Sequence, residues 1–141
     1  MKKEIWLIII LALIIVGLGA FLLFGPHTTP TLRGGNGGIE ISFVSGDSSP
    51  MTIKGYVTGK NGWAGFEGQV GTVKLLDASG KELANGVLTA TTEWTTLPTN
   101  FETTLNFSSA KAQSGTLVFH NENASGLPEK DKTFTLPVKI K

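Results

Sequence analysis

The chain has 141 residues, of which 12 are basic and 11 acidic, so its formal net charge at pH 7 is only +1. It contains no cysteine, which excludes disulfides, thiol catalysis and cysteine-based zinc sites. From Gly34 onward nine lysines stand against ten acidic residues, and this near-neutral segment lacks the basic footprint expected of a nucleic-acid-binding protein.

Residues 5–24 form an apolar stretch without a single charge, from Ile5 to Phe24. A helix of these 20 residues, at about 1.5 Å per residue, is roughly 30 Å long, which matches the hydrocarbon core of a bilayer. The stretch therefore predicts a transmembrane helix whose partner is the lipid bilayer, with Trp6 and Phe24 near the two interfaces.

The charges that flank this stretch predict its orientation. Lys2 and Lys3 precede it, and the next basic residue is Arg33. Because positive charge favours the cytoplasmic side, we expect a bacterial cell-membrane protein with residues 1–4 in the cytoplasm and the C-terminal part outside. A cleaved signal peptide is the alternative, although signal-peptide cores are usually shorter, roughly 7–15 residues.

Residues 25–38 are predicted to form a flexible linker. Gly25 and Pro26 would end the helix, because proline cannot continue it. Four of the five residues from Gly34 to Gly38 are glycine, a composition typical of flexible linkers. The linker would tether the following domain close to the membrane.

From Ile39 onward, short runs of alternating apolar and polar residues predict β-strands separated by turns. In the first run, Ile39, Ile41 and Phe43 would share one buried face. The predicted strands cover residues 39–43, 51–57, 70–76, 81–91, 101–107, 115–121 and 133–140.

Turn and breaker residues add detail to these strands. Asp77 to Gly80 predicts a hairpin connection, Asn85-Gly86 predicts a bulge or bend, and Pro137 predicts an edge strand or a bulge. About seven strands in roughly 100 residues are typical of an immunoglobulin-like β-sandwich. The predicted fold class is therefore all-β, with one such domain over residues 39–141.

One set of segments in the predicted domain is distinctive. It consists of Pro50–Gly55, Phe66-Glu67-Gly68 and Val73–Gly80, and it extends to residues 101–105, 115–118, 125–129 and 137–138. These segments resemble the Gmad2 family, the bacterial immunoglobulin-like domain associated with spore germination. The resemblance implies an extracytoplasmic β-sandwich, often attached to a membrane anchor and without catalytic residues. Adhesion or ligand binding is the role usually suggested for the family.

Four residues form the candidate binding surface of the outer domain: Trp63, Phe66, Glu67 and Trp94. Exposed tryptophans stack on sugars or on partner side chains, whereas the alternative is that one or both cover an edge of the core. Glu67 is either a ligand-binding carboxylate or a structural acceptor for backbone N–H groups. Phe66 would then fill the core, and Gly68 would allow a close approach.

Other residue patterns do not assemble a catalytic or metal site. Residues 121–131 gather oxygen-bearing side chains, but their spacing differs from a calcium loop, so a solvated loop is expected. His27 and His120 are far apart, and neither a nucleophile elbow nor a nucleotide-binding loop is present. We therefore expect a non-enzyme without a metal or cofactor.

Two functions remain open at this point. The first is a membrane-anchored module that binds an envelope protein or cell-wall glycan through its loops. The second is a structural accessory subunit of a membrane complex. In that case the small residues Gly17, Gly19 and Ala20 would let the transmembrane helix pack closely against another helix.

Overall fold

The computed structural model describes residues 33–141 except 110, 112 and 122. The predicted transmembrane helix with Ile5, Trp6 and Phe24, and the linker residues before Arg33, lie outside the described residues. No helix in the described part of the chain is both long and apolar enough to cross a membrane.

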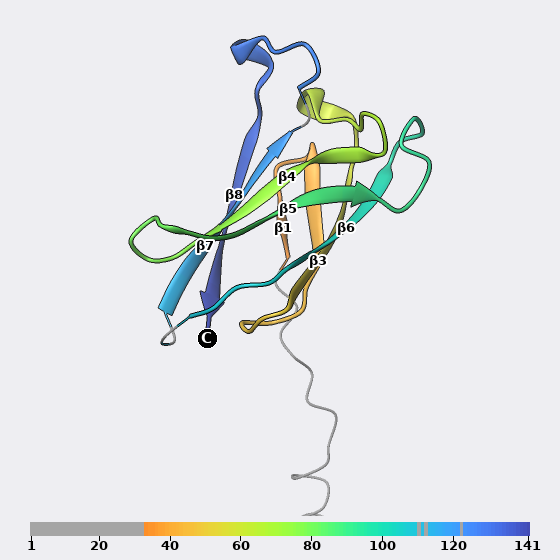
Figure 1. The fold of residues 1–141 in the computed structure, drawn as a ribbon. Helices are drawn as coiled ribbons and strands as arrows, with labels where there is room; N and C mark the ends of the chain where they lie inside the picture. Colours follow the sequence, from red (N-terminus) through yellow and green to blue (C-terminus); the bar gives the residue numbers. More distant parts are fainter. Residues whose placement is uncertain (1–32, 110, 112, 122) are drawn as a thin grey trace, which may run out of the picture.

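One antiparallel sheet of eight strands, in the order β1-β2-β3-β6-β5-β4-β7-β8, makes up the domain (Figure 1). Seven strands match the predicted ones within a few residues, and the eighth, β1, was not predicted. The strands are β1 (Gly34–Gly35), β2 (Ile39–Val44), β3 (Met51–Val57), β4 (Gln69–Leu76), β5 (Glu82–Ala90), β6 (Thr99–Leu105), β7 (Gln113–Asn121) and β8 (Thr133–Ile140). Two single-turn 3₁₀ helices, η1 (Lys60–Gly62) and η2 (Pro128–Lys130), complete the fold.

The sheet curls into a nearly barrel-like, immunoglobulin-like domain. Strands β5 and β6 share only two residue pairs, Thr89 with Glu102 and Ala90 with Phe101, so the sheet turns over at this joint. Its two edges meet on the other side, because a Cβ added to Gly34 of β1 would lie 2.7 Å from the Leu136 Cδ1 of β8. The two halves of the sheet therefore enclose one core between them.

The prediction of a flexible linker is wrong for residues 34–38, because these residues belong to the folded domain. Gly34 pairs with Ile41 of β2, and the Asn36 side chain accepts hydrogen bonds from the N–H groups of Gly38 and Ile39 at 2.9 and 3.1 Å. Strand β1 packs where a side chain would collide with β8, so these glycines allow a close approach rather than free motion.

A single hydrophobic core joins all the strands from β2 to β8. The apolar side chains on one face of β3, which are Met51, Ile53 and Val57, are fully buried. In β2 the alternation breaks at a register shift between Ile41 and Phe43. Val44 is therefore buried in place of Phe43, because a bulge reverses the faces of the residues that follow it.

Strand β5 differs from its prediction in one respect. Asn85 and Gly86 pair in register with Lys74 and Val73 of β4, so the predicted bulge at Asn85-Gly86 is wrong. A Cβ added to Gly86 would instead lie 2.7 Å from the Thr103 hydroxyl of β6. The glycine lets the two halves of the sheet approach each other, which is a tertiary requirement that sequence alone does not distinguish from a bulge.

The edge-strand prediction is confirmed, since β8 with Pro137 ends the sheet. The hairpin at Asp77–Gly80 is confirmed as well. The Asp77 carboxylate accepts hydrogen bonds from the Ser79 hydroxyl at 2.6 Å and from the backbone N–H groups of Ser79 and Lys81 at 2.8 and 3.0 Å. These bonds, the Ser79 hydroxyl first, lower the pKa of Asp77 because they favour the charged form.

The lowered pKa of Asp77 predicts a pH-dependent contribution to stability. A carboxyl group with a lower pKa in the folded state stabilises the protein above its unfolded pKa of 3.8 and loses that contribution as the pH falls below it. We therefore expect the difference in free energy of unfolding between wild type and Asp77→Asn to be constant above about pH 5 and to shrink below pH 4. Urea denaturation from pH 2 to 7 measures it, and a difference independent of pH would contradict the prediction.

Candidate functional site

Trp63 lies inside the core and not on the surface. Its side chain is fully buried, and its indole N–H donates a 3.0 Å hydrogen bond to the Val70 carbonyl. Burial with a satisfied N–H is the usual state of a structural tryptophan. The prediction that Trp63 belongs to a binding surface is therefore wrong. The alternative, that the tryptophan covers an edge of the core, is closer to the structure, in which the side chain lies inside the core.

Glu67 and Gly68 occupy the tip of a tight hairpin. Phe66 and Gln69 exchange two backbone hydrogen bonds of 2.7 and 3.1 Å, and the two residues between them have positive φ angles of 50° and 85°. These are features of a type I′ turn. Within the described residues the exposed Glu67 carboxylate makes no hydrogen bond or ion pair, so the expected acceptor role for its side chain is not present.

Phe66 and Trp94 come together on the outside of the domain. Their rings meet edge to face, with centroids 6.3 Å apart. Phe66 is 38 % exposed, whereas Trp94 is half-buried, so the expectation that Phe66 fills the core is wrong. Leu97, in the same β5–β6 loop as Trp94, is 47 % exposed. We refer to Phe66, Trp94 and Leu97 as the aromatic surface.

The loops beneath the aromatic surface are held in place. A Cβ on Gly65 would lie 3.0 Å from the Trp94 carbonyl oxygen, and the buried Thr99 hydroxyl donates to the carbonyls of Trp94 and Thr96 at 3.3 and 3.1 Å. Leu97 packs over Gly59, where an added Cβ would collide with the Leu97 side chain. Because Gly59 and Gly65 have no side chains, Leu97 and Trp94 can pack closely against the chain at these positions.

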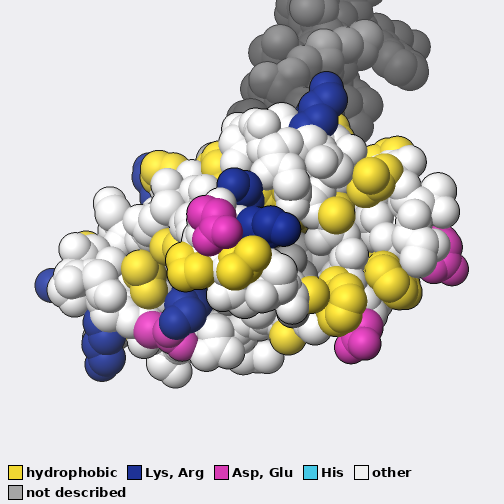
Figure 2. Space-filling view, turned by 90° about the horizontal axis from the view of Figure 1, so that it is seen from above, with side chains coloured by type: hydrophobic (Ala, Val, Ile, Leu, Met, Phe, Trp, Pro, Cys, Tyr) yellow, Lys and Arg dark blue, Asp and Glu magenta, His cyan; other side chains and the backbone are white. Residues whose placement is uncertain are grey.

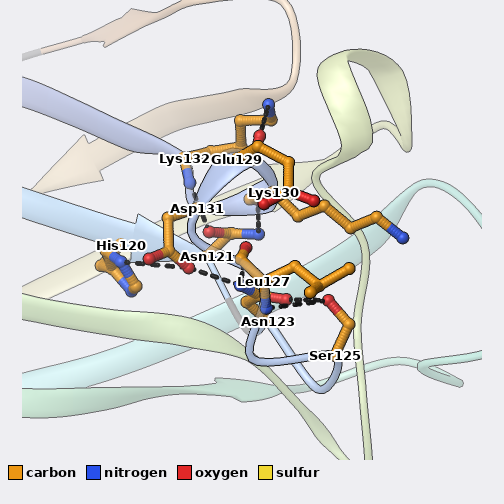
Figure 3. A network of polar contacts seen from close by, with 9 residues as sticks. All are labelled: His120, Asn121, Asn123, Ser125, Leu127, Glu129, Lys130, Asp131 and Lys132. Carbon is orange, nitrogen blue, oxygen red and sulfur yellow. Dashed lines mark hydrogen bonds and ion pairs between the residues drawn. The ribbon is translucent and has the colours of Figure 1, made fainter.

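The loop after β7 is closed by one asparagine. The Asn121 side chain is buried, accepts a 2.6 Å hydrogen bond from the Lys132 N–H and donates to the Lys130 carbonyl at 3.2 Å (Figure 3). Within the loop, Asn123 donates to the Asp131 carboxylate at 2.5 Å, and His120 lies 3.9 Å from the same carboxylate. The expected solvated loop is thus an ordered polar network.

A hollow of about 580 Å³ lies between this loop and η1, lined by Asn61, Gly62, Lys130 and Lys132. The residues that the structure describes contain no group of three His, Asp or Glu side chains that could hold a metal ion. That the protein is not an enzyme stays a prediction.

Sequence reasoning missed Leu97 and the hollow. Leu97 precedes Pro98 in a Thr-rich loop, and an apolar residue isolated among loop residues was the only available indication. The hollow joins residues 61–62 to residues 130–132, which no sequence pattern relates. Of the four predicted surface residues, the structure brings Phe66 and Trp94 together, leaves Glu67 at the adjacent turn and buries Trp63.

Replacing the two tryptophans separates the core role from the surface role. Trp63→Ala should lower the free energy of unfolding by roughly 3–5 kcal/mol, because it empties a buried site. Trp94→Ala should cost less, about 1–2 kcal/mol, since its side chain is only partly buried. Chemical denaturation of both variants measures these values, and equal losses would contradict the assignment.

Removing the Asn121 side chain should open the 122–131 loop. We expect Asn121→Ala to cost about 1–3 kcal/mol, because the loop amide and carbonyl groups lose their buried partners. Hydrogen exchange of the Lys132 amide should accelerate as well. Asn85→Ala, which removes one exposed hydrogen bond to Glu82, serves as the control and should change stability little. An unchanged Lys132 exchange rate in Asn121→Ala would contradict the closing role.

The comparison with known families identifies the domain. A family model described as the immunoglobulin-like domain of bacterial spore germination matches residues 45–126, more than half of the chain. No curated protein and no solved structure matches the chain. The match begins just after β2 and ends in the loop that follows β7, so it includes every residue of the aromatic surface. The chain belongs to the Gmad2 family of immunoglobulin-like domains.

Proposed function

We propose that this protein is a non-catalytic binding module, anchored in the bacterial cell membrane by residues 5–24 and displaying its immunoglobulin-like domain outside the cell. The observation that carries the binding role is the exposed Phe66 ring, which packs edge to face against the half-buried Trp94, with the exposed Leu97 in the same loop as Trp94. Its partner would be an envelope protein or a cell-wall glycan.

The aromatic surface suits recognition because its rings lie at the surface and are held by the backbone beneath them. Exposed apolar groups that gather in one place mark interaction sites more often than scattered ones do, and aromatic residues contribute strongly to binding energy. The backbone contacts of Gly65 and Thr99 hold Trp94 before any partner arrives. Preorganisation of this kind lowers the entropy that binding costs.

The direction of β1 agrees with display away from the membrane. The chain runs through β1 to Asn36, whose carbonyl accepts a hydrogen bond from Asn61 of η1. We call this end of the domain, which carries η1 and the β3–β4, β5–β6 and β7–β8 loops, the loop end. If residues 5–24 span the membrane, residues 25–33 form the connection, and nine such residues span roughly 15–18 Å as a flexible chain. The aromatic surface would then face the cell wall.

The binding role is tested with isotope-labelled protein and separated fractions of cell-wall glycan and envelope protein. Amide shifts should cluster at residues 65–69 and 92–98 with one fraction, and Phe66→Ser/Trp94→Ser should abolish them. Tyr56→Ser/Val87→Ser removes two other exposed apolar side chains and should leave the shifts in place. Shifts elsewhere, equal loss in both variants, or no shifts with either fraction would contradict the role and favour the structural-subunit alternative.

The anchor is tested by fractionation of the source cells. The chain should remain in membranes after alkaline extraction, and protease added to cells stripped of their wall should remove the domain from outside. Release by alkali, or protection from protease, would contradict the proposed anchor or its orientation.

A further inference from the structure

The hollow between η1 and the β7–β8 loop combines residues that lie about 70 positions apart in the sequence. Asn61 and Gly62 form one side, and Lys130 and Lys132 form the other. A Cβ placed on Gly62 would lie 3.7 Å from the Lys132 Cε, so the two sides touch at this point. Asn121 fixes the backbone of both lysines through its side-chain hydrogen bonds.

The lysines of the hollow lack counter-charges among the described residues. No ion pair includes Lys130 or Lys132, whereas the ion pairs that are present use Lys54, Lys74 and His120. Asp131 stands between the two lysines in sequence, but it turns toward Asn123 and His120, while the Lys130 side chain extends the other way (Figure 3). Asp131 is thus engaged elsewhere, and the neighbouring Glu129 forms no ion pair with either lysine within the described residues.

The donors that remain in the hollow are mostly charged. Each ammonium group carries three N–H donors, and Lys132 uses one in a long contact of 3.5 Å to the Glu129 carbonyl. Asn61 donates one amide hydrogen to the Asn36 carbonyl and retains a second. Lys60, the first residue of η1, adds a third exposed lysine nearby. From this end of the molecule, basic side chains appear near the middle of the face, with an acidic side chain and hydrophobic side chains beside them (Figure 2).

Two lysines line this open hollow, and their side chains extend in different directions (Figure 3). They suit a ligand with several oxygen acceptors and more charge than one carboxylate. Lysine binds phosphate as a point charge without demanding a fixed geometry. The volume of about 580 Å³ falls in the range of small-molecule sites, roughly 300–1,000 Å³, so an ester larger than the bare ion would fit.

We propose that the hollow formed by Asn61, Gly62, Lys130 and Lys132 binds the phosphate group of a phosphate ester. Under the proposed anchoring this end of the domain points away from the membrane, so the expected ester is a soluble or polymeric phosphodiester. A phospholipid headgroup shares this chemistry and is the other outcome of the test. The site goes beyond the proposed function and does not depend on the aromatic surface, from which it is separated by η1.

The test follows amide shifts of the full chain in a neutral maltoside detergent during titration with glycerol 3-phosphate. Sodium chloride of matched ionic strength is titrated in parallel. Shifts at residues 61–62 and 130–132 should saturate with the phosphate ester and not with chloride. Lys130→Gln/Lys132→Gln should weaken binding about tenfold or more, because two charge contacts are lost.

Two control variants make the outcome specific. Lys139→Gln/Lys141→Gln removes two lysines near the C-terminus, at the opposite end of the domain (Figure 1), and should bind as wild type does. Phe66→Ser/Trp94→Ser should also bind the ester unchanged, so failure of the phosphate site and failure of the proposed function remain distinguishable. Shifts that follow ionic strength alone, or equal weakening in both lysine pairs, would overturn the proposal.

A second arm separates the two sources of phosphate. Glycerophosphoglycerol in solution and bicelles that contain phosphatidylglycerol are compared with bicelles of phosphatidylcholine alone. Saturable shifts at the hollow with the soluble diester point to a polymer, and shifts only with phosphatidylglycerol point to a lipid surface. Either result supports phosphate recognition, and the absence of shifts with both probes overturns it.

Discussion

The burial of Trp63 determines how the loop end of this domain is built. Its indole fills the core and its N–H bonds to the Val70 carbonyl, so the chain between β3 and β4 is fixed at its middle. On one side of Trp63 lies η1, which forms a wall of the hollow lined by Lys130 and Lys132, and on the other lies the turn that carries Phe66. Because a fully buried tryptophan has essentially one position in a close-packed core, both surfaces are positioned by the same side chain.

Glycines and cross-loop hydrogen bonds then complete the two surfaces. Gly59 and Gly65 leave room for Leu97 and Trp94, while Asn121 closes the loop that carries Lys130 and Lys132. Each loop therefore depends on a partner from a distant part of the chain. The result is one end of the domain that carries both an aromatic area and a basic hollow.

Sequence patterns predicted most of the fold because they reflect local physics. The strands from β2 to β8 follow the period-two alternation, and the Asp77 turn and the Pro137 edge follow from the chemistry of those residues. Predictions failed at positions whose role depends on contacts with distant parts of the chain. Glycine serves flexible linkers, bulges and close approaches alike, so the roles of Gly34 and Gly86 were assigned wrongly. Trp63 and Trp94 both stand in loops, and only the packing of the sheet separates the buried ring from the exposed one.

The most direct test of this account is hydrogen exchange of the tryptophan indole N–H groups, measured by NMR and assigned with Trp→Phe variants. The account predicts that the Trp63 indole exchanges slowly, as a buried and hydrogen-bonded group opens only with the surrounding core, whereas the Trp94 indole exchanges rapidly. Equal exchange rates for the two, or slow exchange at Trp94 alone, would contradict the central claim that Trp63 organises the loop end from inside the core while Trp94 lies at the surface.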